Sequence, residues 1–258
     1  MRRGLKAEYR NGVYRVRVRL GYSNLLVASD RAEGVSAAIT ALTCHKAQLQ
    51  AYLTHNPLYR YSLEPVEVED WAPQVVKLAA EAAWKAGVGP MAAIPGALAE
   101  LALKTLTQTG AKIGLVEDGG EIAAHSHKPL TLAIYAGTSP LSGKVGFHLA
   151  SEDFPLGVAT SSATVSHAIN FGEADAAVVV ADSAALADAA AKAVCNMVKG
   201  STSEAVRKGL EKAEEIEGVR GALIICGSHL GTVGKLPKII KLEGEPRKIL
   251  EAALHFHG

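Results

Sequence analysis

Residues 157–172, GVATSSATVSHAINFG, gather side chains that could do chemistry. Five residues with hydroxyl side chains precede one histidine, His167. They are Thr160, Ser161, Ser162, Thr164 and Ser166. Apart from His167, no acidic or basic side chain occurs from 157 through 170. Hydroxyls can donate to phosphate or carbonyl oxygens, and a histidine, with an unperturbed pKa of about 6.5, can act as a general base near neutral pH. The same residues also fit a turn in which the hydroxyls bond to local backbone, so chemistry alone leaves both interpretations open.

Two glycine-containing segments could bring the backbone close to a ligand. Gly89 and Met91 lie in residues 87–91, GVGPM, ahead of an alanine-rich helical segment, and the free N–H groups at a helix N-terminus attract anions. Gly119 and Gly120 lie between two predicted strands, where they could form a turn or let a flat ligand lie against the backbone. Tight packing of the loop explains both segments equally well.

Histidine and cysteine pairs offer only partial metal sites. His125 and His127 stand two apart in a predicted strand, so both rings would face the same way, but no third ligand is evident. Cys226 and His229 form a single C-x-x-H, whereas structural zinc takes four ligands. We expect ordinary side chains at these positions and a frayed end at 255–258, HFHG.

Hydrophobic periodicity and turn residues predict the elements that would position these side chains. The alternation in VYRVRVRL, followed by GYSN and LLVA, predicts a hairpin over 13–28 with an arginine-bearing solvated face. Helices are expected over about 30–53, 74–86, 92–109, 183–198 and 203–217. Strands are expected over about 112–116, 121–125, 130–136, 144–149, 155–161, 176–181 and 221–226. Helices and strands in blocks predict an α+β fold with mixed or antiparallel sheets, in a single domain over residues 1–258 with a tail from about 243.

Composition excludes several classes of protein. The 27 Lys and Arg against 26 Asp and Glu leave a formal charge of +1, which gives no reason to expect binding to nucleic acid or to an anionic membrane. The 48% hydrophobic content is typical of soluble globular proteins. Three widely spaced cysteines fit a reducing compartment, and no apolar run typical of a signal peptide follows the basic N-terminus. We therefore expect a cytoplasmic protein.

Five segments resemble, in the same order, an uncharacterised cytosolic family that is itself similar to the ApbE flavin transferases. They are HKAQLQAYLTHNPLYRYSLEPV, VGPMAAIPGALAE, VEDGGEI, GVATSSATVSHAINFGEADAAVVVADSAALADAAAKA and GTVGKLPK. The resemblance extends from about residue 13 to 242. It implies a T-fold-like single domain that binds FAD, holds its pyrophosphate with Mg²⁺ and transfers FMN to a Thr or Ser hydroxyl of an acceptor protein.

The resemblance also implies roles for individual residues. Gly119 and Gly120 would lie against the flavin, and His167 would lie near the reacting phosphate as the catalytic residue. The remaining expected cofactor contacts are Thr160, Ser161, Ser162, Ser166, Gly89 and Met91. Asp188 would be a metal ligand.

The sequence departs from ApbE where the metal would bind. Lys192 stands where ApbE has a second metal ligand, a threonine, four residues after Asp188. Residues i and i+4 share a helix face, so the Lys192 ammonium could take the place of Mg²⁺ beside Asp188. Asn170 and Phe171 also replace the Asp-Pro that follows the histidine in ApbE. We therefore expect Mg²⁺ binding to be weak or absent, with FAD or FMN as the cofactor.

Three functions stay open at this point. The first is an ApbE-like protein that binds a flavin or another phosphate-bearing nucleotide and transfers FMN. The second is a non-catalytic ligand-binding or scaffold protein that has lost the metal site, an interpretation that Lys192 motivates. The third comes only from the resemblance and is an accessory role in sulfide assimilation or homocysteine formation, in which Cys195 or Cys226 would take part. The resemblance leaves a homodimer open.

Overall fold

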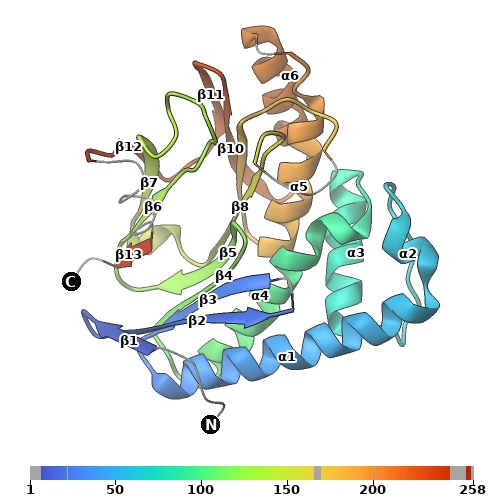
Figure 1. The fold of residues 1–258 in the computed structure, drawn as a ribbon, viewed down its shortest axis with the longest axis vertical. Coiled ribbons are helices and arrows are strands. Elements are labelled where there is room, and N and C mark those ends of the chain that lie inside the picture. The colour runs from blue at the N-terminus through green and yellow to red at the C-terminus, as the bar shows by residue number, and fades with distance from the viewer. Residues whose placement is uncertain (1–6, 22, 166–169, 201, 245–253, 257–258) are drawn as a thin grey trace.

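The chain folds into two antiparallel sheets with helices on the outer face of the larger one (Figure 1). This computed structural model describes residues 7–21, 23–165, 170–200 and 202–244, together with the backbone of 254–256. Every strand pairing within these ranges is antiparallel. The predicted α+β class is confirmed.

The larger sheet has nine strands in the order β1-β2-β3-β4-β5-β8-β9-β10-β11. Their bounds are Ala7–Arg10, Val13–Leu20, Ser23–Ser29, Ile113–Asp118, Glu121–Ser126, Leu156–Ser161, Ala176–Ala181, Val219–Cys226 and His229–Gly234. The smaller sheet has the order β12-β7-β6-β13, with bounds Lys238–Lys241, Val145–Leu149, Leu130–Ala133 and Leu254–Phe256.

Helices cover one face of the larger sheet, some in contact with its strands and others packed mainly on neighbouring helices. They are α1 (Ala32–His55), α2 (Pro57–Tyr61), α3 (Gln74–Ala86), α4 (Ile94–Thr107), α5 (Ala184–Met197) and α6 (Ser203–Glu214), with short 3₁₀ turns η1 (Pro90–Ala93) and η2 (Ser151–Asp153). The smaller sheet covers the opposite face, where Phe147 and Leu132 join Leu115 and Val158 of the larger sheet in a second core. No single helix in the described ranges is long and apolar enough to cross a membrane.

Period-two alternation in the predicted hairpin produces β2 and β3. Tyr14 and Val16 face the helical core, while Arg17 and Arg19 are exposed on the other side. The arginine stripe therefore fits the solvated face that the sequence predicts.

The structure corrects the predicted C-terminal end. Residues 254–256 form β13, which pairs with β6 and places Leu254 opposite Leu132. The frayed end expected at 255–258 is therefore wrong for the described part, because an open edge of the smaller sheet offers backbone hydrogen bonds to this segment. Four further elements, β1, α2, β11 and β12, lie outside the predicted ranges because they are short or exposed.

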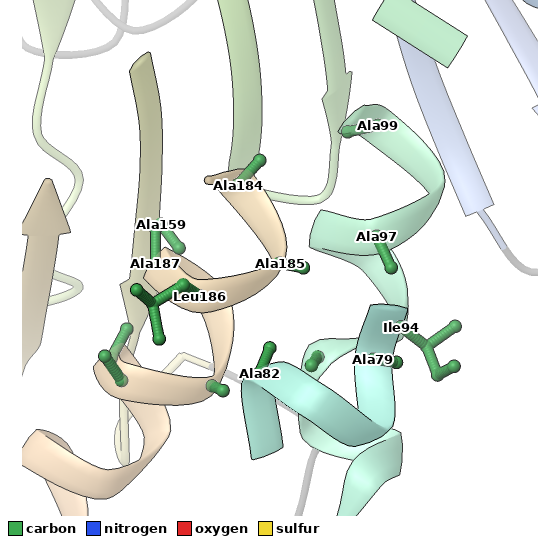
Figure 2. Packing of buried hydrophobic residues seen from close by; sticks show 14 of the residues in the cluster. Ala79, Ala82, Ile94, Ala97, Ala99, Ala159, Ala184, Ala185, Leu186 and Ala187 are labelled. Carbon is green, nitrogen blue, oxygen red and sulfur yellow. The ribbon is translucent and has the colours of Figure 1, made fainter. Parts of the chain in front are cut away.

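Helices α3, α4 and α5 meet through small side chains (Figure 2). Ala79 and Ala82 of α3, Ala97 of α4, and Ala185 and Ala187 of α5 lie in this buried layer. At Gly96, an added Cβ would lie 2.3 Å from the Ala184 carbonyl oxygen, so the two helix backbones approach each other closely there. This contact fixes the position of α5, the helix that carries Asp188.

Candidate functional site

Strand β8 divides the predicted hydroxyl side chains between two faces of the sheet. Ala159 belongs to the helical core and Val158 to the core between the sheets. Because successive side chains of a strand alternate, Ser161 faces α5 while Thr160 faces the opposite way. The two residues predicted as neighbouring ligand contacts therefore reach different sides of β8.

Beyond β8 the chain turns, and the turn uses its own hydroxyls. Ser162 Oγ accepts hydrogen bonds from the backbone N–H groups of Thr164 (3.2 Å) and Val165 (3.0 Å). Thr164 Oγ1 donates to Asp175 Oδ1 at 3.1 Å, and Asp175 Oδ2 accepts from the Gly227 N–H at 2.7 Å. The local-backbone interpretation thus accounts for Ser162, while Asp175 anchors the turn to the loop after β10.

Sequence reasoning did not single out Asp175. The available signal was an acidic residue placed directly before the fully apolar strand 176–181. Ser166 and His167 lie outside the described residues, so their predicted roles stay predictions.

The Asn170 side chain hydrogen-bonds back to the end of β8. Its Nδ2 donates to Ser161 Oγ at 3.2 Å and to the Ser162 carbonyl oxygen at 3.1 Å. Its Oδ1 is buried and accepts no hydrogen bond within the described part of the chain. Phe171 follows with its N–H donated to Asn196 Oδ1 at 3.0 Å, so the loop is tied to the end of α5.

The Gly119–Gly120 turn brings carboxyl groups together. Both glycines have left-handed backbone, with φ of 75° and 120°, and they connect β4 to β5. Asp118 and Glu121 pair across this turn on the face that carries the helices. Asp188 of α5 acts electrostatically on Glu121, so the three acidic side chains form one group.

The buried environment of these three carboxyl groups disfavours their ionised forms. Burial raises the pKa of Asp188 to about 8, although a hydrogen bond from the Gly96 N–H and the charge of Lys192 act in the other direction. Burial also raises the pKa of Glu121 well above its ordinary value, and the nearby Asp188 and Asp118 raise it further. The sequence pattern points to the glycines of this turn, whereas its two carboxyl groups, Asp118 and Glu121, become candidates only from the structure.

Two lysines lie on either side of the acidic group. Lys192 stands one helical turn after Asp188 and favours its charged form, the relation expected from their spacing. Lys46 of α1 favours the charged form of Asp118, which burial opposes. Lys46 lies on α1, and no local sequence pattern connects that helix with the turn.

Weak or absent Mg²⁺ binding stays a prediction. In the described ranges, no three or more His, Cys, Asp or Glu side chains are grouped so as to hold a metal ion. His127 lies beyond the end of β5 with Nδ1 3.3 Å from the Lys112 carbonyl oxygen, and Cys226 is buried while His229 is exposed. The charge of Lys192 acts on Asp188 and favours its ionised form.

Gly89 has a packing role. A Cβ at this position would lie 2.0 Å from the Ser62 carbonyl oxygen, so close contact with the segment after α2 requires glycine. Met91 lies in η1 and packs against the helical core. Contacts from Gly89 and Met91 to a cofactor stay predictions.

Comparison with known proteins identifies the family. The family model described as AbpE bacteria matches residues 6–230. The chain belongs to this family. A UPF0280 protein of Methanococcus maripaludis is 37% identical over 232 residues, which are 89% of this chain and 94% of that protein. A UPF0280 protein of Methanocaldococcus jannaschii is 39% identical over 233 residues, with 89% and 94% covered.

Solved structures show the same fold at low sequence identity. The flavinyl transferase ApbE of Pseudomonas stutzeri, in its apo form, superposes with a TM-score of 0.57 and 14% identity, covering 90% of this chain and 96% of that one. The ApbE protein of Thermotoga maritima gives a TM-score of 0.55 and 13% identity, with 85% and 96% covered. This member of the AbpE bacteria family therefore has an ApbE-like fold.

Proposed function

We propose that this protein binds a flavin nucleotide beside the Gly119–Gly120 turn and transfers FMN from FAD to a Thr or Ser hydroxyl. The observation that carries the proposal is the convergence of two elements on this turn in an ApbE-like fold: Asp188 of α5 acts on Glu121, and the Thr160 carbonyl oxygen of β8 lies 4.0 Å from the position that a Cβ of Gly120 would take. The left-handed glycines present backbone without side chains, which suits a flat ring system. FAD supplies an anhydride bond whose cleavage drives the transfer.

The side chains of the chain itself supply charge and protons. Lys192 and Lys46, whose charges act on Asp188 and Asp118, would balance the negative charge of the nucleotide. Ser161 faces α5, where its hydroxyl would contact the ligand, and His167 would serve as general base. Thr160 would contact the ligand through its backbone carbonyl oxygen, which faces Gly120, because its side chain lies on the other face of β8. We place the protein in the cytoplasm, with an acceptor protein as partner.

The proposal is tested with purified full-length protein. Incubation with FAD and a threonine-bearing acceptor, with and without added Mg²⁺, should produce an acceptor whose mass rises by one FMN unit. Binding of FAD is followed separately by flavin fluorescence. The matched variants are Ser161→Ala, which removes a proposed contact, and Ser36→Ala, which removes an exposed hydroxyl on α1. Absence of both binding and mass gain would refute the proposal.

Lys192 favours a second candidate function, a non-catalytic ligand-binding or scaffold protein. Its charge acts on Asp188, and by the resemblance it stands at the sequence position of a metal-ligating threonine. This function predicts FAD binding without any mass gain on acceptors, whereas the first predicts both.

A further inference from the structure

Ser23 begins β3 at the edge of the candidate site. Leu25 pairs with Asp118, so the antiparallel register carries Ser23 to the Gly119–Gly120 turn. Leu25 and Val27 belong to the helical core, and alternation places Ser23 on the same face. Its side chain is half-buried, so a bound molecule can reach it.

Three elements converge on the Ser23 hydroxyl. Ser23 Oγ donates a hydrogen bond to Asp118 Oδ2 at 3.0 Å, and Lys46 Nζ donates to Ser23 Oγ at 2.5 Å. The hydroxyl therefore stands between a carboxylate that can accept its proton and an ammonium that stabilises negative charge on its oxygen. An activated nucleophile typically has its hydroxyl within hydrogen-bond reach of a base and of a charged third group, and Ser23 has this arrangement.

Asp118 is suited to accept a proton. Burial raises the pKa of this carboxyl, while Ser23 and Lys46 act in the other direction. A carboxylate with a raised pKa is a stronger base than an exposed one. The two lysines near the acidic group match the charge of a phosphoric anhydride better than that of a neutral substrate.

We propose that Ser23 is a nucleophile that takes a phosphoryl-linked group from a phosphoric anhydride bound at the Gly119–Gly120 turn. The identity of the donor as FAD rests on the proposed function, and the acceptor hydroxyl then lies in the same chain. A bond forms between Ser23 Oγ and phosphorus while the anhydride P–O bond breaks. The electron pair leaves with AMP, the Ser23 proton passes to Asp118, and the product is FMN joined to Ser23 through a phosphodiester.

The first experiment measures nucleophilicity without FAD. The full-length protein is treated with diisopropyl fluorophosphate, from which Ser23 Oγ displaces fluoride, and peptide mass spectrometry gives labelling rates for Ser23 and for the exposed Ser36. We expect Ser23 to be labelled at least about a hundredfold faster, the lower end of general-base assistance. Equal rates for the two serines would overturn the proposal.

Matched variants separate activation from folding. Lys46→Ala and Asp118→Asn should each slow Ser23 labelling to about the rate of Ser36, while Lys46→Arg should recover part of it because the cation is kept. Ser36→Ala should leave Ser23 labelling unchanged. Circular dichroism and the thermal midpoint show which variants are folded, and only those are compared. Full labelling in a folded Asp118→Asn protein would refute the role of Asp118 as base.

The second experiment uses FAD and distinguishes this inference from the proposed function. A mass gain of one FMN unit on the Ser23 peptide, with release of AMP, supports both. An FMN adduct on another hydroxyl overturns Ser23 as acceptor and leaves the transferase function standing. Fast labelling of Ser23 by the fluorophosphate without FAD binding supports the nucleophile and refutes the flavin function.

Discussion

Asp188 and Gly96 join two helices through one buried hydrogen bond. Asp188 Oδ2 of α5 accepts the Gly96 N–H of α4 at 2.9 Å. The first N–H groups of a helix have no partner within it, so this carboxyl supplies an acceptor that α4 needs. The same oxygen belongs to the acidic group at the Gly119–Gly120 turn, and the stability of the helix pair is therefore linked to the charge of the site.

Replacement of Asp188 by Asn should make stability less dependent on pH. Burial raises the pKa of Asp188 to about 8, above an ordinary value of about 3.9. Its contribution to the free energy of unfolding is then full below about pH 4 and is lost as the pH rises towards 8. Asn keeps an acceptor for Gly96 and has no charge to bury.

Thermal unfolding at pH 5 and pH 8 measures this effect. The wild-type midpoint should fall between these values by more than that of Asp188→Asn. A one-unit pKa difference corresponds to about 1.4 kcal/mol, so a change of at least this size is expected. Parallel pH profiles for the two proteins would contradict it. Asp182→Asn, an exposed change next to α5, is the control.

Replacement of Lys192 by Thr should create or strengthen Mg²⁺ binding. The change removes an ammonium beside Asp188 and supplies an oxygen at the i+4 position. Isothermal calorimetry with Mg²⁺ alone measures the affinity. Lys208→Thr, on the exposed face of α6, controls for the loss of one positive charge. If both variants bind Mg²⁺ as the wild type does, the account of position 192 is wrong.

Substitution of Gly96 by Ala should destabilise the protein, although alanine favours helices in general. The new Cβ would lie 2.3 Å from the Ala184 carbonyl oxygen and 2.8 Å from Asp188 Cβ. Overpacking of this kind costs about 1–3 kcal/mol, which exceeds the gain of up to about 1 kcal/mol from helix propensity. Urea unfolding gives the difference, and an unchanged or higher stability would contradict the close approach of the two helices.

The cysteines should differ in their reactivity towards iodoacetamide. Cys44 is exposed, whereas Cys195 and Cys226 are buried and burial raises the pKa of both thiols. Only the thiolate reacts at a useful rate, so Cys44 should be alkylated first and the other two chiefly after unfolding. Fast alkylation of native Cys195 would contradict this prediction and would support the thiol chemistry implied by a role in sulfide assimilation.

Sequence reasoning predicted the larger elements because their periodicity is local. Helix α3 occurs over the predicted residues 74–86, and Gly87 ends it in left-handed conformation. The site was harder to predict because it depends on contacts between residues distant in the chain. Lys46 reaches Ser23, and Gly96 reaches Asp188 across 92 positions, through the packing of helices that no local pattern encodes.

The alternation of side-chain directions along β8 follows from the sequence pattern alone. A period of two sends the side chains of Thr160 and Ser161 to opposite faces of the sheet, while their contacts to a ligand stay predictions. The family resemblance predicted the fold correctly over most of the chain because it rests on segments long enough to define element order.

The alanine-rich packing of α5 has a consequence for recognition. Alanine has no side-chain torsion to freeze, so most of the buried side chains of the helix that carries Asp188 and Lys192 cannot change rotamer when a ligand binds. A ligand would meet a surface shaped before it arrives and would lose little affinity to ordering the protein. Such a surface favours discrimination by shape, and molecules of related chemistry but different outline should be rejected by it.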